Sequence, residues 1–172
     1  EASLLEFDAF RAMFINGELL CHGNSEHIAC QTRPVGENEE LALSKSFPGL
    51  SEAANNKTYV LEIRQSMKIP IVIDFVCSES LVALFPRLQI ICGKDVQATV
   101  VLRFLGAHAV DRDHLRPDQM KSGIDIFNQP IVLVDAQRNC DLTLVTEVAG
   151  NSRVRHFGEE HLTIQESAKV KS

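Results

Sequence analysis

Residues 88–100 read Leu-Gln-Ile-Ile-Cys-Gly-Lys-Asp-Val-Gln-Ala-Thr-Val, and they decide the predicted fold. A strand-like apolar run is followed by a polar corner, a small residue and a second strand-like run. Similar stretches are Leu144-Val-Thr-Glu-Val-Ala-Gly-Asn-Ser-Arg-Val-Arg-His156 and Leu162-Thr-Ile-Gln-Glu-Ser-Ala-Lys-Val170. Three imperfect copies of one unit favour stacked coils, as in a β-helix, where each coil buries its inward side chains against its neighbours.

The chain after Thr58 has the same texture throughout. Short β-branched runs are separated by turn residues, and no amphipathic helix of ordinary length lies between them, so we expect a mainly β fold. A β-sandwich or a meander would give similar runs and stays an alternative to the β-helix. The expected strands cover residues 59–63, 69–77, 88–91, 98–104, 131–134, 142–148, 154–157 and 162–165.

Composition divides the chain near residue 60. Of its 27 Val and Ile residues, 24 lie in residues 60–172, and residues 1–59 carry nine acidic and four basic side chains. We therefore expect residues 1–58 to form an irregular, partly helical region with a hairpin, and residues 59–172 to form the β core.

Local signals refine the expectation for the N-terminal region. Ser3-Leu-Leu-Glu6 has the form of a capping box, which opens helices. Asn16-Gly17 supplies the positive φ values of a type I′ turn, so residues 10–22 are predicted to be a hairpin. Helix formers in residues 39–46 and 50–54 predict a loosely helical, acidic connector over residues 23–58.

Composition also excludes several classes of protein. The chain has 172 residues, a net charge of −6 and an apolar fraction of 45%, which is typical of one globular domain. With no Lys/Arg-rich run, no Trp and one Tyr, it offers no basis for nucleic-acid binding. No apolar run reaches the roughly 18 residues of a membrane span, and no signal peptide is visible. Because the last copy reaches Ser172 without a closing cap, we expect a C-terminally incomplete fragment.

The five cysteines do not form a disulfide pattern. Their number is odd, their spacing is wide, and no two of them form a C-x-x-C pair. A reducing, cytoplasmic compartment is the simpler interpretation. Cys77 and Cys92 end apolar runs and are expected to be buried as small hydrophobic side chains. The five are Cys21, Cys30, Cys77, Cys92 and Cys140.

Several of these segments resemble one protein family. Pro86-Arg-Leu-Gln-Ile-Ile91 followed by Gly93-Lys-Asp-Val-Gln-Ala-Thr-Val100 resembles the PR…V-x-G-E-x-A-x-A-T-V segment of the SufB/SufD family, the scaffold proteins of the SUF system for iron–sulfur cluster assembly. Asn151-Ser-Arg-Val-Arg-His-Phe157 resembles the family's E-N-A-R-V-E-H-Y segment. Val145-Thr-Glu-Val148 resembles the V-T-E-I just before it.

Two upstream segments extend the resemblance in the same order. Met13-Phe-Ile-Asn-Gly17 is similar to the VFVNG near the start of SufD-type members. Tyr59-Val-Leu-Glu-Ile-Arg64 with Ile69-Pro-Ile-Val-Ile73 is similar to V-I-E-V-P…K-P-I-H-L. Together the five segments cover most of residues 10–172, and SufD-like is the leading interpretation, although the SufB type stays open.

The resemblance implies a right-handed parallel β-helix behind an irregular, partly helical N-terminal region. It implies a cytoplasmic scaffold, not an enzyme, that works with a paralogous SufB-like scaffold and a SufC-like ATPase subunit. The iron–sulfur cluster would be handled by the full complex, and no cofactor is expected on this chain alone. Whether the chain also forms a homodimer stays open.

The chain departs from the family pattern in two places. The family's C-terminal helical region, with its Cys/His segment for the ATPase contact and the cluster, has no counterpart in these 172 residues. No functional residue of the family is therefore carried over, and no catalytic or cofactor-binding residue is assigned. Residues 106–123 are longer and more charged than the family pattern predicts.

Two clusters offer metal ligands by residue type. His108, Asp111, Asp113 and His114 provide imidazole and carboxylate groups. A solvated surface loop, in which the alternating charges neutralise one another, is the favoured interpretation, because a metal site needs convergent geometry that spacing does not show. The second cluster, Cys21-His22 with His27 and Cys30, has soft ligands, although the adjacent Cys-His pair suits one tetrahedral zinc poorly.

Catalytic patterns are weaker. There is no G-x-S-x-G, P-loop or G-x-G-x-x-G motif. A metal-dependent cupin-type enzyme would use His156 and His161 with Glu159 or Glu160, and this is the alternative from another functional class. A glycosidase on a β-helix would need paired acids such as Asp135 and Asp141. A β-rich protein-interaction module is the third alternative.

Overall fold

A computed structural model describes residues 10–16, 18–22, 26–34, 57–77, 82–84, 86–106, 126–128, 130–149, 154–156 and 158–172. Every regular element in this part of the chain is a β-strand, and it contains no helix. The mainly β expectation is confirmed. Of the predicted helical segments, Ser3–Glu6, 39–46 and 50–54 lie outside the described residues.

The N-terminal strands extend the sheets of the β core. Strand β1 (Phe10–Ile15) and strand β2 (Glu18–His22) form the predicted antiparallel hairpin, with Asn16 at a φ of 50° in the turn. Strand β3 (Ile28–Pro34) pairs antiparallel with β4 (Lys57–Ile63). The expectation of a loosely helical connector is therefore wrong for residues 28–34, where antiparallel backbone pairing with β4 stabilises a strand.

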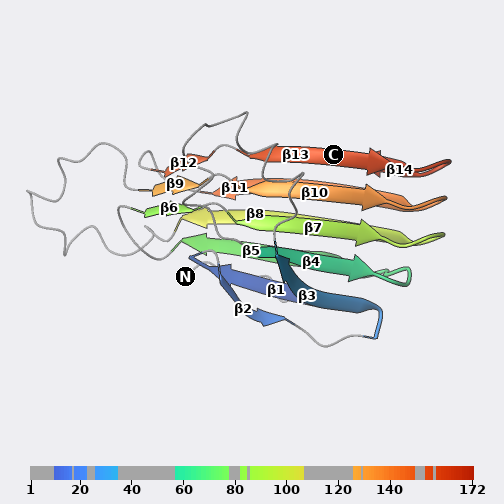
Figure 1. Cartoon of the computed structure of the whole chain (residues 1–172), viewed down its shortest axis with the longest axis horizontal. Helices are drawn as coiled ribbons and strands as arrows, with labels where there is room; N and C mark the ends of the chain where they lie inside the picture. The colour runs from blue at the N-terminus through green and yellow to red at the C-terminus, as the bar shows by residue number, and fades with distance from the viewer. Residues whose placement is uncertain are drawn as a thin grey trace, which may run out of the picture.

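From β4 onward the chain visits three sheets in a fixed rotation. Successive strands belong to the five-stranded, the six-stranded and the three-stranded sheet, and the cycle then repeats. We call β4–β6, β7–β9, β10–β12 and β13–β14 the first to fourth layers. Figure 1 shows the strands stacked from β1–β3 in blue to β13 and β14 in red. Their bounds are β5 (Ile71–Cys77), β6 (Val82–Leu84), β7 (Arg87–Cys92), β8 (Gln97–Gly106), β9 (Ile126–Asn128), β10 (Ile131–Ala136), β11 (Asp141–Ala149), β12 (Val154–His156), β13 (Glu159–Ile164) and β14 (Lys169–Lys171).

All pairings between successive layers are parallel and in register. Ile90 of β7, for example, lies between Leu61 of β4 and Val134 of β10. Parallel sheets are normally buried, and runs rich in Val, Ile and Leu suit them. All eight predicted strand segments coincide with strands of these layers.

The core consists of equivalent side chains stacked from layer to layer. Leu61, Ile90 and Val134 are at most 1% exposed, and the next residue of that stack, Leu162, is 45% exposed in the fourth layer. A second stack joins the rings of Phe14, Phe75 and Phe104, whose neighbouring centroids are 4.8 Å apart. Each inward side chain is therefore buried by the layers on both sides of it.

Three equivalent turns link the five-stranded sheet to the six-stranded sheet. They cover residues 93–96, 137–140 and 165–168, and each closes with a hydrogen bond from its fourth N–H to its first carbonyl. Their third residues, Asp95, Asn139 and Ser167, have φ values of 58°, 59° and 58°. This left-handed conformation suits Asp and Asn, whose short polar side chains tolerate it. The turns stack directly, because Asp95 N donates to Arg138 O (3.1 Å) and Asn139 N to Glu166 O (3.2 Å).

The turns correct one repeat boundary predicted from sequence. Strand pairing aligns residues 88–100 with residues 132–144 and 160–170, because Leu88 pairs with Val132 and Val132 with Glu160. The predicted copy at 144–156 instead begins within β11 and ends within β12, so it joins the six-stranded to the three-stranded sheet. In sequence, Gly150-Asn151 resembles the turn that begins at Gly93. The repeat aligned by strand pairing has Gln137 at the position of Gly93.

Candidate functional site

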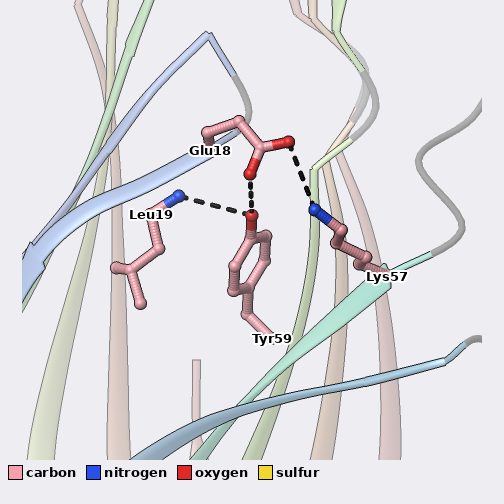
Figure 2. Close-up of polar contacts among 4 residues, drawn as sticks. All are labelled: Glu18, Leu19, Lys57 and Tyr59. Carbon is pink, nitrogen blue, oxygen red and sulfur yellow. Dashed lines mark hydrogen bonds and ion pairs between the residues drawn. The ribbon is translucent and has the colours of Figure 1, made fainter.

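A polar cluster joins the hairpin to the first layer (Figure 2). The Tyr59 hydroxyl donates to Glu18 Oε2 at 2.8 Å and accepts from the Leu19 N–H at 3.3 Å. Lys57 Nζ lies 3.8 Å from Glu18 Oε1. Because Tyr59 is on β4 and Glu18 is on β2, this cluster links the hairpin to the first layer by side-chain hydrogen bonds.

Burial and the Glu18 hydrogen bond both affect Tyr59. Its side chain is 2% exposed and meets the Phe14 ring edge-on, with centroids 4.7 Å apart. Burial, followed by the hydrogen bond to the Glu18 carboxylate, raises the pKa of the Tyr59 phenol. The phenol therefore stays protonated at neutral pH, and its role in the cluster is to donate a hydrogen bond.

A second polar network crosses the five-stranded sheet from β3 to β10. The Arg33 guanidinium donates to Gln89 Oε1 from Nε (3.1 Å) and from Nη2 (2.8 Å), and Gln89 Nε2 donates to Asp135. The Gln89 amide thus bridges a cation on β3 and a carboxylate on β10. These three partly exposed side chains form what we call the outer polar row, which links β3, β7 and β10 through side-chain hydrogen bonds.

The third polar feature is an ion pair on the six-stranded sheet. Arg103 Nε and Nη2 donate to Asp74 Oδ1 (2.6 Å) and Oδ2 (2.8 Å), a bidentate arrangement between directly paired residues of β5 and β8. The Asp74 side chain is 3% exposed and that of Arg103 is 21% exposed. The hydrogen bonds from Arg103 to Asp74 raise the pKa of the guanidinium, with Glu147 adding a smaller effect.

The sequence-predicted metal clusters can be located only in part. His108, Asp111, Asp113 and His114 lie outside the described residues. Cys21 and His22 belong to β2, but their side chains are not described; His27 precedes β3, and Cys30 lies within it. Burial raises the pKa of the Cys30 thiol. Among the residues that the structure describes, no three His, Cys, Asp or Glu side chains are grouped to hold a metal ion.

The residues that the cupin-type and glycosidase alternatives would use are dispersed over several strands. His156 lies in β12, whereas Glu159, Glu160 and His161 lie in β13. Glu160 accepts hydrogen bonds from the Thr146 and Ser172 hydroxyls, both at 3.2 Å. The parallel pairing of these sheets differs from the antiparallel jelly roll that cupins use. Asp135 belongs to the outer polar row, and Asp141 begins β11.

Sequence reasoning missed the three polar features above. A signal for the ion pair was present, because Asp74 and Arg103 each interrupt an otherwise apolar strand. The Tyr59 cluster and the outer polar row had no such signal, since their contacts join residues at least 39 positions apart in sequence (57 − 18 for Lys57 and Glu18).

In the described part of the chain, no helix has the length and apolar character needed to cross a membrane. Comparison of the chain with protein-family models, with curated proteins and with solved structures gave no match.

Proposed function

We propose that the four layers are coils of a right-handed parallel β-helix. The rotation of the chain through three sheets, with each strand parallel to the strand three positions later, is the observation that supports this proposal. Right-handed crossovers are the rule between parallel strands of one sheet. The alternation of buried and outward residues along β7 and β10 agrees with coils that share one core.

We propose that the chain is a SufD-like scaffold subunit of the SUF iron–sulfur cluster assembly complex. The family-like segment 86–100 coincides with β7, the Gly93 turn and β8, and Met13–Gly17 coincides with the hairpin turn. A stack with the outer polar row on one face suits a protein that organises partners. In this role it is not an enzyme, and the cluster is cargo of the complex.

The proposed partners are a SufB-like paralogous scaffold and a SufC-like ATPase subunit in the cytoplasm. Binding to the paralogous scaffold is the direct test. The purified chain is mixed with a SufB-like scaffold, and the complex is measured by size-exclusion chromatography with light scattering. We expect a stoichiometric complex. Two separate peaks from two folded proteins would contradict the proposed function.

A matched pair of variants separates a specific complex from non-specific adhesion. Ile90→Asp introduces a carboxylate at a position with 0% exposure and should abolish both folding and binding. Lys94→Ala removes an exposed turn side chain, so it should change neither. Equal binding by the two variants would mean that the contact does not require the stacked fold.

A further inference from the structure

Two buried cysteines lie next to one another on successive layers. Cys92 is the last residue of β7 and is 0% exposed, and Cys140 ends the next turn and is 1% exposed. Both are free thiols. They belong to the second and the third layer, which are also joined by backbone hydrogen bonds, apolar packing and the hydrogen bond from Gln89 to Asp135.

The backbone holds the two residues in fixed positions. Gln137 N donates to Cys92 O at 3.0 Å, and Cys140 N donates to Gln137 O at 3.1 Å. The backbone of Gln137 is therefore hydrogen-bonded to the backbone of both cysteines. Cys92 Sγ donates to Val96 O at 3.9 Å, and the same carbonyl accepts a hydrogen bond at 2.9 Å from the N–H of Asp141, the residue after Cys140. The two buried cysteines thus lie beside the same carbonyl in the core of the reduced protein.

Burial makes this pair unreactive while the stack is closed. Desolvation, with a smaller contribution from Cys140, raises the pKa of Cys92 to about 12, and desolvation also raises the pKa of Cys140. The thiolate is the nucleophile in disulfide exchange, so thiols that stay protonated react slowly. Thiol–disulfide exchange can then occur during folding, before the core closes, or after a local opening that exposes the thiols to solvent.

We propose that Cys92 and Cys140 form a latent disulfide site that links the second and third layers under oxidising conditions. The oxidant class is a small-molecule disulfide such as glutathione disulfide. One cysteine thiolate attacks it, a mixed disulfide forms, and one glutathione leaves. The second cysteine thiolate attacks the first cysteine sulfur, the Cys92–Cys140 bond forms, and the second glutathione leaves. The two cysteines lose two electrons and two protons, and glutathione disulfide becomes two thiols.

The same burial that delays formation would protect the finished bond. A reductant must reach a sulfur atom that is shielded by the core, so reduction in the folded state should also be slow. The link would connect adjacent layers across a long intervening segment, which restricts the unfolded chain. We therefore expect the oxidised protein to resist denaturant better than the reduced protein.

Peptide mapping tests the proposal. The full chain is refolded from denaturant in a glutathione redox buffer, alkylated and digested with trypsin. The two cysteines fall in the peptides Leu88–Lys94 and Asn139–Arg153, separate from those carrying Cys21, Cys30 and Cys77. We expect these two peptides to be the dominant linked pair, and the urea midpoint to be higher than in the reduced protein. When the native reduced protein is placed in the same buffer without denaturant, it should form the link at least about tenfold more slowly than the refolding protein does.

Variants keep the test decisive. Cys30→Ser should retain the link, and Cys140→Ala should lose both the link and the gain in urea midpoint. Cys92→Ser serves as a second loss variant if Cys140→Ala fails to fold. Three results would each overturn the proposal. The links could mainly involve Cys30, the mixed glutathione disulfide at Cys92 could persist without forming the internal link, or the linked protein could have a lower urea midpoint than the reduced protein.

Discussion

The aromatic stack formed by Phe14, Phe75 and Phe104 provides a quantitative test of the layered packing. These residues lie on β1, β5 and β8, in direct register, and each is at most 4% exposed. Neighbouring rings are 4.8 Å apart, with interplanar angles of 15° and 13°. Phe75 lies in the middle and stacks on both of the others.

The expected cost of Phe75→Leu follows from these contacts. Each aromatic pair contributes about 0.5–1.5 kcal/mol beyond the burial of its area, so the loss of two pairs costs about 1–3 kcal/mol. Leucine keeps much of the apolar volume, and the change of shape adds less than about 1.5 kcal/mol. The free energy of unfolding should therefore fall by about 1–4 kcal/mol, measured by urea denaturation with circular dichroism.

Double-mutant cycles with Leu test which rings interact. We expect coupling energies of about 0.5–1.5 kcal/mol for Phe14 with Phe75 and for Phe75 with Phe104. Phe14 and Phe104 are separated by β5, so their coupling should stay within about 0.5 kcal/mol. A Phe14–Phe104 coupling as large as the other two, or no coupling in any cycle, would refute this account of the packing.

Three further predictions concern the turns, the ion pair and pH. Gly93→Ala should lower the free energy of unfolding, measured in urea, by about 1–3 kcal/mol, because a Cβ there would lie 2.8 Å from Ile63 O. The control Gln137→Ala, at the equivalent position of the next turn, should be nearly neutral. Asp74→Asn should cost about 2–4 kcal/mol, because it removes the buried carboxylate that forms the bidentate contact with the partly exposed Arg103. The control Glu62→Gln removes the partner of the exposed Arg64 and should cost less than about 1 kcal/mol, and equal costs would refute the assignment. Raising the pH from 9 towards 12 should lower the free energy of unfolding, because Cys92, Cys140 and Tyr59 have raised pKa values and keep protons that the unfolded chain releases. In urea titrations, Cys92→Ala should make this fall shallower by up to about 1.4 kcal/mol per pH unit, and an unchanged slope would contradict the contribution of Cys92.

Local chemistry explains which parts of the fold could be predicted. Asn16-Gly17 specifies a tight turn without help from the rest of the chain, and the hairpin forms at the predicted residues. The apolar runs of the layers are buried on the core side by their neighbours, so their β-branched composition was sufficient to find the strands. Burial of Cys92 was also predicted and is confirmed.

The errors arise where long-range pairing decides the structure. Residues 28–34 become a strand because β4 supplies partners for their backbone, and their own sequence, with Ala29 and Pro34, gives a weak strand signal. The second repeat was misaligned because its turn uses Asn139 in the left-handed conformation and has no glycine. The contacts of Tyr59 with Glu18 and of Arg33 with Gln89 depend on the fold and cannot be found from spacing.

The parallel stacking of layers is the central claim, and nuclear Overhauser effects test it most directly. On a sample labelled at methyl groups, Val134 should show contacts with both Ile90 and Leu162, because β10 lies between β7 and β13. Equivalent contacts should join Leu102 to Ile73 in the six-stranded sheet. Observation of both sets would support the stack. Antiparallel contacts between β10 and β11, as in a meander or a sandwich, with no contact from Val134 to Ile90, would contradict it.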